Sequence, residues 1–307
     1  MEDSAATTSS DGRRDEAPTS GDWEGRIVRG FRLARVALDV LCSDRRLLLL
    51  PMASALCALL ALLATATLAR RLHGESDAVR VIAPVWIAAY AISFITIFFN
   101  VALAHVVVRR WRGEPARIAD GVGAAGARVT AIAGWAILTT TVGLLLQLIE
   151  RLTLGVSQIV LGIFADVAWS VASFFVVPVL VVERRGPVGA LRRSGQVVRE
   201  RWAEGLAGVT PIALATLIVL LPLFGLVFIG LVLYVTGLTA PGLLAMAGGV
   251  VAIAAVWIVS GAVTQVFTLA VFQHATGGPC FEGFPAADLE RPRDGSPKRW
   301  LRKLRVR

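Results

Sequence analysis

The chain alternates between long, uninterrupted runs of apolar residues and shorter polar stretches. Six runs reach the roughly 20 residues that a helix needs to cross a bilayer core of about 30 Å. They cover residues 47–69, 81–108, 129–149, 156–182, 206–236 and 240–272. None contains lysine or arginine, and none alternates apolar with polar positions as a barrel strand does. We therefore expect an all-α fold, a polytopic transmembrane bundle of six helices.

Basic residues gather on alternate sides of these runs. The segment before the first run, the second and fourth connections and the tail after the sixth run hold 27 of the 31 lysines and arginines. Cytoplasmic segments of membrane proteins carry this excess, so we expect a multi-pass protein with both termini in the cytoplasm. The net charge of +9 then reflects topology and implies no nucleic-acid partner. Frequent Arg, Ala, Gly and Val are typical of GC-rich bacterial genomes, which favours the bacterial cell (inner) membrane.

The chain before the first run divides into two parts. Residues 1–22 are polar and predict a disordered cytoplasmic lead. Residues 23–46 place apolar side chains on one helical face and arginines on the other, which predicts a basic amphipathic helix in the membrane interface. Such a helix serves one of two roles: it orients the first span, or it senses lipid or docks a partner. A second interfacial helix is predicted in the fourth connection, at residues 186–202.

The chain after the last run, residues 273–307, predicts a basic cytoplasmic tail that ends in PKRWLRKLRVR. Its lysines and arginines either bind anionic lipid or simply hold the C-terminus inside. The three cysteines, Cys42, Cys57 and Cys280, lie in a span or on the cytoplasmic side, so we expect free thiols.

Polar residues inside the spans are the candidates for chemistry, because they are costly in hydrocarbon. Small and polar residues recur at helical spacing in four of the runs and form stripes. Such stripes are either faces along which helices pack or the lining of a polar path through the bundle. The candidate intramembrane polar site consists of Asp166, Asn100, Gln265 and Ser170. Asn100 and Gln265 lie at comparable depth, which allows a hydrogen bond between them.

Asp166 is the most unusual of these residues. It lies ten residues into its run, about 15 Å from the outer end and close to the middle of the bilayer. An ionised carboxylate at this depth is expensive, and no span offers a basic partner. We expect the carboxyl group either to be protonated or to face water in an internal cavity. Both a proton-coupled transporter and a plain bundle with one buried, hydrogen-bonded acid fit this expectation.

The chain lacks the sequence motifs of common enzymes and metal sites. It has three histidines and no HExxH, P-loop or GxSxG sequence. An intramembrane hydrolase needs a nucleophile with a base, or a second aspartate at matching depth, and Asp166 stands alone among the runs. We therefore expect no catalytic residues, no cofactor and no metal.

Three stretches of the chain resemble a family of uncharacterised bacterial six-span membrane proteins. They are residues 173–206 (SFFVVPVLVVERRGPVGALRRSGQVVRERWAEGL), 25–51 (GRIVRGFRLARVALDVLCSDRRLLLLP) and 97–103 (IFFNVAL). The loop pattern is also distantly similar to the membrane domain attached to some glycerophosphodiester phosphodiesterases. The chain has no catalytic domain of that kind, so the resemblance implies a fold and a membrane location but no activity.

Together with the lack of enzyme motifs, these patterns predict a non-enzymatic accessory or lipid-interacting membrane protein. Its partner is then the lipid bilayer, with anionic lipids bound by the basic tail and the interfacial helices. Small-residue faces, Ala245 with Gly249 and Gly248 with Ala252, predict self-association into a homo-oligomer. The alternative is a small-solute or proton-coupled transporter that uses Asp166.

Overall fold

The computed structural model describes residues 38, 41, 44–71, 77–152 and 156–277, and these ranges are helical between short turns. The predicted all-α class is confirmed for them. The predicted lead, most of residues 23–46, Cys42, Cys280 and the tail beyond residue 277 lie outside the described residues. In chain order the helices are η1 (Arg45–Leu48), α2 (Leu49–Arg71), α3 (Asp77–Trp111), α4 (Ile118–Gly126), α5 (Val129–Leu152), α6 (Val156–Ser173), α7 (Val176–Val182), α8 (Pro187–Val235) and α9 (Thr239–Ala275).

All six predicted spans are helical and apolar enough to cross a membrane. The spanning parts are Arg46–Arg71, Ile82–Trp111, Val129–Glu150, Gly162–Val182, Ile212–Val235 and Thr239–Ala275. Their ends differ from the predicted ones by a few residues, except in the fourth and fifth spans. The protein is therefore a polytopic transmembrane helical bundle, as its hydropathy pattern predicts.

The fourth span is broken near its inner end, between α6 and α7. The break falls at Phe174 and Phe175, just before Pro178, which lies in the first turn of α7 where a helix does not need the missing N–H. The backbone N–H of Phe175 donates to Oγ of Ser194 on α8, at 3.0 Å. Ser194 is fully buried. This side chain therefore satisfies a backbone donor that the break exposes inside the protein.

The fifth span belongs to a longer helix than the sequence predicts. Helix α8 begins at Pro187, so the predicted interfacial helix of the fourth connection is continuous with the span that follows it. It also remains helical through Pro211 and Pro222. The position of its first turns in the membrane interface stays a prediction.

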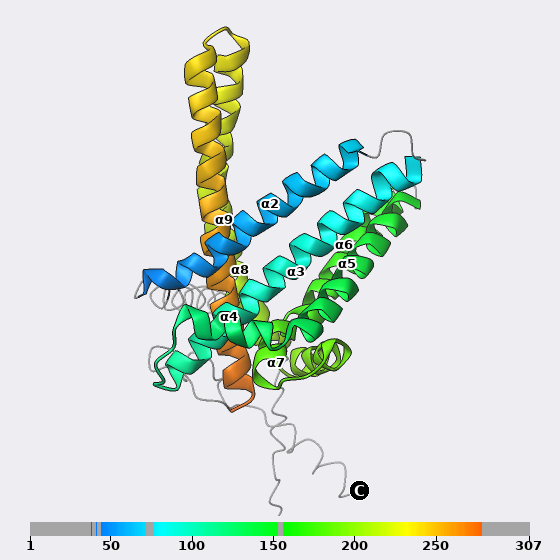
Figure 1. Cartoon of the computed structure of the whole chain (residues 1–307), viewed down its shortest axis with the longest axis vertical. Helices are drawn as coiled ribbons and strands as arrows, with labels where there is room; N and C mark the ends of the chain where they lie inside the picture. The colour runs from blue at the N-terminus through cyan, green and yellow to red at the C-terminus, as the bar shows by residue number, and fades with distance from the viewer. Residues whose placement is uncertain (1–37, 39–40, 42–43, 72–76, 153–155, 278–307) are drawn as a thin grey trace, which may run out of the picture.

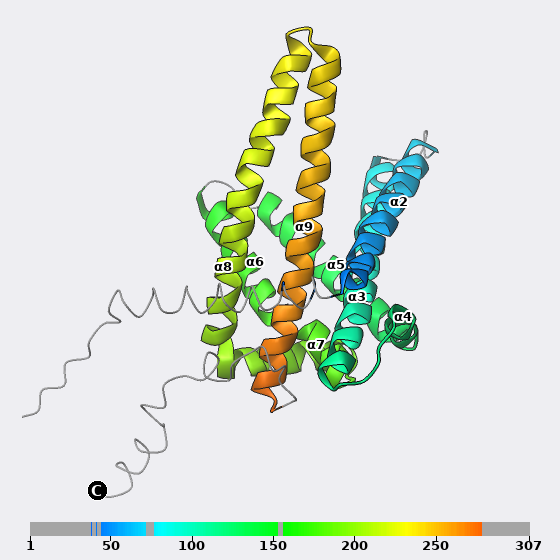
Figure 2. The ribbon, with the colours of Figure 1, turned by 90° about the vertical axis from the view of Figure 1, so that its left-hand side faces the viewer.

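The spans diverge from a common base rather than forming a parallel bundle. Helices α2, α3, α5 and α6 lean to one side, whereas α8 and α9 form an upright hairpin that reaches farther (Figure 1). A view from the side shows the α2–α3 pair and the α8–α9 pair separating upwards (Figure 2). The buried core lies at the base, and it includes most of residues 101–108 of α3, residues 262–273 of α9, and α7.

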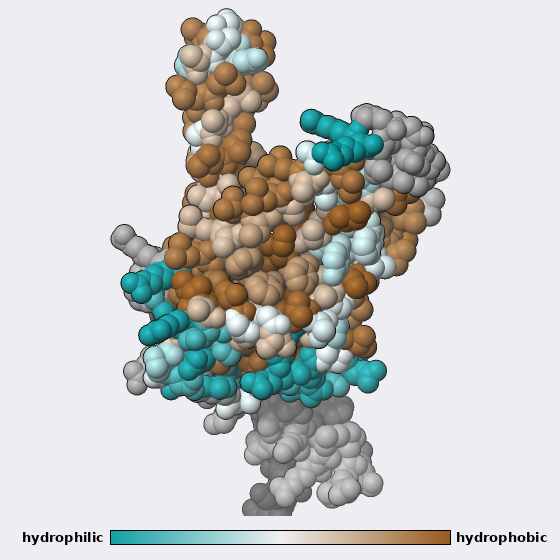
Figure 3. Space-filling model, in the orientation of Figure 1, coloured by the Kyte–Doolittle hydropathy of each residue, from teal (hydrophilic) through white to brown (hydrophobic). Residues whose placement is uncertain are grey.

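The surface above this base is apolar. Leu221 and Leu244, on the two helices of the hairpin, expose 70% and 74% of their surface. Figure 3 shows a hydrophilic band at the base and an apolar surface above it. A soluble protein would not leave so many large apolar side chains in water, so this surface is suited to lipid.

Glycines bring α8 and α9 together. A Cβ atom on Gly242 would lie 2.6 Å from the backbone N of Tyr234, and one on Gly230 would lie 2.7 Å from the backbone N of Met246. Gly249 is buried in the same way against Val227 of α8, so it packs within the hairpin and is not available for the predicted contact between copies. Gly248 lies on the open side, with no neighbour within 4 Å of its Cβ position.

Candidate functional site

The structure places Asp166 and Ser170 on the outside of the chain. Both side chains are exposed on α6, one turn apart. Their neighbours on this face are apolar, because Ile163 and Val167 expose 59% and 54% of their surface. Asp166 therefore lies in a surface suited to hydrocarbon, and not among the side chains of the core.

Asn100 and Gln265 lie elsewhere, on α3 and α9, which pack against each other. Both residues are half-buried. The hydrogen bonds of the described residues include none between them, and Nε2 of Gln265 is buried without a partner. Helix α6 packs mainly on α5 and α8, so the four predicted residues fall into two separate places.

The polar stripes of the spans serve in part as packing faces, one of the two interpretations that the sequence allows. Oγ1 of Thr140 on α5 donates to Oγ of Ser93 on α3, at 3.2 Å. Hydroxyl oxygens of Thr216 on α8 and Ser260 on α9 lie 2.7 Å apart. These hydrogen bonds join neighbouring spans, as hydroxyl side chains of transmembrane helices commonly do.

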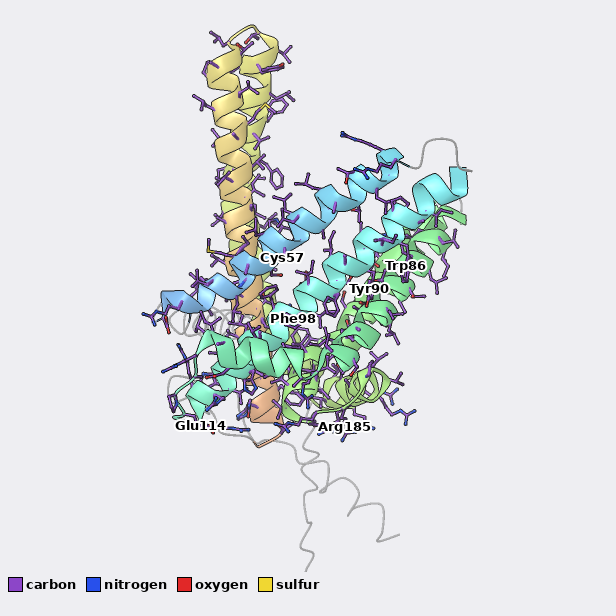
Figure 4. The ribbon with its side chains drawn as sticks, viewed as in Figure 1. Cys57, Trp86, Tyr90, Phe98, Glu114 and Arg185 are labelled. Atoms are coloured by element: carbon purple, nitrogen blue, oxygen red, sulfur yellow. The ribbon has the colours of Figure 1, made fainter. Side chains whose placement is uncertain are left out.

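Charged side chains gather at the base, where α3 ends, α4 begins and α7 passes into α8. We call this region the arginine-rich end, and Figure 4 shows Glu114 and Arg185 within it. Its described arginines are Arg46, Arg109, Arg110, Arg112, Arg117, Arg128, Arg184, Arg185, Arg192, Arg193 and Arg199. Its carboxylates with described side chains are Asp44, Glu114, Asp120 and Glu183.

Carboxylates order the turn between α3 and α4. Nε of Arg109 lies 2.9 Å from Oε2 of Glu114, and its Nη1 lies 3.5 Å from Oδ2 of Asp120. Asp120 also accepts the backbone N–H of Arg117, at 2.8 Å, and so caps the first turn of α4. Glu114 and Asp120 thus both pair with Arg109, and Asp120 also caps the start of α4.

The other two carboxylates are also paired. Glu183, just after α7, lies 2.7 Å from Nε of Arg185 and 2.8 Å from Nε of Arg193. Asp44 forms an ion pair with Arg110, in the last turn of α3, and accepts the backbone N–H of Arg46 at 2.9 Å. Hydrogen bonds from Arg110 and Arg46 lower the pKa of the Asp44 carboxyl group.

The lowered pKa of Asp44 gives a pH-dependent contribution to stability. We expect Asp44→Asn to lower the free energy of unfolding at neutral pH by about 1 kcal/mol or less, because the pair is partly exposed. The native pair is stabilising above the ordinary pKa of aspartate, and its contribution is lost as pH falls through the lowered pKa of the folded state. Thermal unfolding of the two proteins at neutral pH and at about pH 3 tests this. A difference that persists undiminished in acid would contradict it.

The excess of arginine is the main property of this end. The four carboxylates pair with Arg109, Arg110, Arg185 and Arg193. The ion pairs of the described residues do not include Arg112, Arg117, Arg184, Arg192 and Arg199, all of which are exposed. This end therefore presents fixed positive charge at the boundary between the apolar surface and water.

Arg128 differs from these exposed arginines. It is half-buried in the turn between α4 and α5, and its Nη1 donates to the carbonyl oxygen of Leu180 near the end of α7. Burial, with a smaller effect of the Arg184 charge, lowers the pKa of its guanidinium.

The described residues hold no group of three His, Cys, Asp or Glu side chains arranged for a metal ion.

The comparison with known families agrees with part of the predicted resemblance. Residues 79–282, more than half of the chain, match a family of unknown function (DUF6159). The match begins just before the second span and extends past the sixth. No curated protein matches the chain significantly. The distant similarity to the membrane domain of glycerophosphodiester phosphodiesterases stays a prediction that these matches do not support.

Proposed function

The chain belongs to this family of unknown function, DUF6159, and we propose that it is a non-enzymatic accessory protein of the bacterial inner membrane that binds anionic lipids at its arginine-rich end. The observation that carries the proposal is the charge arrangement at that end. Each carboxylate there with a described side chain is paired, whereas the ion pairs of the described residues leave out most of the exposed arginines of this end. A basic residue near an anionic membrane surface contributes about 1 kcal/mol to the attraction.

The proposed orientation rests on the same residues. The arginine-rich end faces the cytoplasm, where the positive-inside rule places such loops and where the leaflet is anionic. Both termini then lie inside, and the basic segments 23–46 and 273–307 add charge to the same membrane surface. The absence of catalytic sequence motifs supports the non-enzymatic part of the proposal.

The lipids that remain bound after extraction test this function. The full chain would be extracted into polymer nanodiscs, and its phosphatidylglycerol content would be compared with that of the source membrane. We expect enrichment in the native protein and a marked loss when Arg112, Arg117, Arg192 and Arg199 are changed together to glutamine. The matched control is Arg70→Gln with Arg71→Gln, since these exposed arginines lie at the opposite end of α2.

The outcomes of this experiment separate specific from general attraction. Enrichment that survives the four substitutions, or that falls equally in the control, would refute a role for the arginine-rich end. Absence of enrichment in the native protein would refute anionic-lipid binding altogether.

Transport of a small solute or of protons through Asp166 is the alternative function. What favours it is an acidic side chain about 15 Å along a membrane span. Transport requires that water reach this carboxyl group from one side of the membrane or from both. Its exposure on an apolar outer face of the chain therefore supports the accessory role more than the transport role.

A further inference from the structure

Helix α9 carries the longest apolar stretch among the spans that the structure describes. It runs from Thr239 to Ala275, 37 residues without an aspartate, glutamate, lysine or arginine, whereas the third span, Val129–Glu150, has 22 residues. At a rise of about 1.5 Å per residue, these lengths are roughly 55 Å and roughly 33 Å. The third span thus fits a bilayer core of about 30 Å, and α9 exceeds that core by roughly 25 Å.

The inner ends of these two spans lie close to one depth, so the excess length is at the outer end. Arg128, just before α5, donates to the carbonyl oxygen of Leu180 near the end of α7. Phe175, just before the start of α7, packs against Phe272 of α9, with ring centroids 5.9 Å apart. The C-terminal end of α9 is therefore nearly level with the start of α5. Its extra length reaches past the outer ends of the other spans (Figure 1).

Over this outer part α9 is buried only where it meets α8. Apart from Gly242 and Gly249, which pack against α8, the buried residues of α9 fall within residues 262–273. Val235 of α8 and Val251 of α9 expose 76% and 68% of their surface. The hairpin is thus held mainly by the inner third of α9, and it separates from α2 and α3 above the base (Figure 2).

The two helices of the hairpin are tightly joined to each other. Gly230 and Gly242 bring the two backbones together near the outer end, and the hydroxyl oxygens of Thr216 and Ser260 lie 2.7 Å apart farther in. Close packing through small residues and hydrogen bonds between spans both stabilise helix pairs in lipid. Because the hairpin is joined along its length and fixed at one end, a change in its direction moves both helices together.

We propose that the α8–α9 hairpin responds to bilayer thickness by changing its tilt at the base. A span that is longer than the hydrocarbon core reduces the mismatch by tilting. In a thinner bilayer the hairpin leans farther, and in a thicker bilayer it stands more upright. The pivot lies beside the break in the fourth span, because Phe272 packs on Phe175. Thickness, and not headgroup charge, drives this change, so the inference is independent of anionic-lipid binding.

Distances between spin labels in liposomes test the tilt in the full chain. The three native cysteines, Cys42, Cys57 and Cys280, are replaced, and labels are attached at the hairpin tip through Leu238→Cys and at the outer end of α2 through Arg70→Cys. Phosphatidylcholine with short, intermediate or long acyl chains varies the thickness without anionic lipid. Because the hairpin and α2 diverge upwards, a larger tilt moves the two labels apart (Figure 2). We expect their separation to grow by on the order of 1 Å for each Å of core thickness removed.

A label pair within the hairpin is the matched control. Phe228→Cys on α8 and Val250→Cys on α9 replace side chains that are 66% and 56% exposed, and their separation should be the same in every bilayer. If this separation changes with thickness, the hairpin opens instead of tilting, and the proposal is wrong. Equal separation of the Leu238→Cys and Arg70→Cys labels in all bilayers would also overturn it, because the lipid would then adapt to a protein of fixed shape.

Shortening the apolar length tests the cause of the tilt. Leu231→Lys with Leu243→Lys places charges at exposed positions of the two helices, about 9 Å below the tip. Less of the hairpin then requires hydrocarbon, so we expect the label separation in thin bilayers to fall towards the native value in thick bilayers. An unchanged separation would show that apolar length does not set the tilt. If this variant does not insert, the thickness series of the native sequence still decides the proposal.

Discussion

Replacing Gly242 by valine is expected to lower the free energy of unfolding by about 3 kcal/mol. The added Cβ would lie 2.6 Å from the backbone N of Tyr234 and 2.8 Å from the carbonyl oxygen of Gly230. Because both atoms belong to the backbone of α8, no side chain can rotate to make room. The two helices must separate, and they lose the close packing that stabilises helix pairs in lipid. Denaturant unfolding in lipid bicelles measures the effect.

Gly248→Ala is the matched control for this substitution. Gly248 lies on the same helix, and its Cβ position has no neighbour within 4 Å. Since alanine is a better helix former than glycine, we expect a gain of about 0.5–1 kcal/mol instead of a loss. Equal stability of Gly242→Val and the native protein would show that α8 and α9 are not packed through these glycines.

Replacing Asp166 by leucine is expected to favour membrane insertion of α6 by about 2–3 kcal/mol. The native carboxyl group lies on an exposed face between apolar neighbours, so the native protein carries the cost of a polar group in hydrocarbon. A glycosylation-reporter assay of the isolated α5–α6 segment measures insertion, and thermal unfolding of the full chain measures stability. A less stable leucine variant would contradict a lipid-facing Asp166 and would indicate a contact with another copy or another protein.

Water access at position 166 separates the accessory role from transport. In a chain in which Cys42, Cys57 and Cys280 are replaced, we expect Asp166→Cys to remain unlabelled by a membrane-impermeant thiol reagent from either side. Arg112→Cys, at the exposed arginine-rich end, is the positive control and should be labelled from the cytoplasmic side only. Labelling of residue 166 in an inserted protein would place transport ahead of the accessory role.

The six spans follow from the sequence because hydropathy and the bilayer thickness set helix length with little help from tertiary contacts. The break in the fourth span does not follow in the same way. Pro178 indicates a disturbance near the inner end, but the break lies at Phe174 and Phe175, and Phe175 donates to Ser194 of the next helix, 19 residues farther along the chain. Nothing in the pattern around Ser194 distinguishes it from an exposed serine in a basic loop.

The candidate site shows a similar limit. Counting residues along a helix predicts a depth for Asp166, but it does not determine which way the side chain points. Asp166 is exposed although Gly162, one turn earlier in the same stripe, is buried against Glu150. The positive charge of the loops is likewise evident from sequence, whereas the pairing of Arg110 with Asp44 and of Arg193 with Glu183 depends on how the helices pack.

The contact between Ser194 and Phe175 has a consequence for the order of events during synthesis. The fourth span leaves the ribosome before α8 does, so the N–H of Phe175 has no protein acceptor until the following helix arrives. The α8–α9 contacts, in contrast, join two helices that are separated only by the turn at Thr236–Leu238. That hairpin is complete as soon as its own two helices are made. Ser194 lies only 19 residues after Phe175, so this contact can form before the α8–α9 hairpin is made, whereas the base closes only when residues 262–273 of α9 join its core.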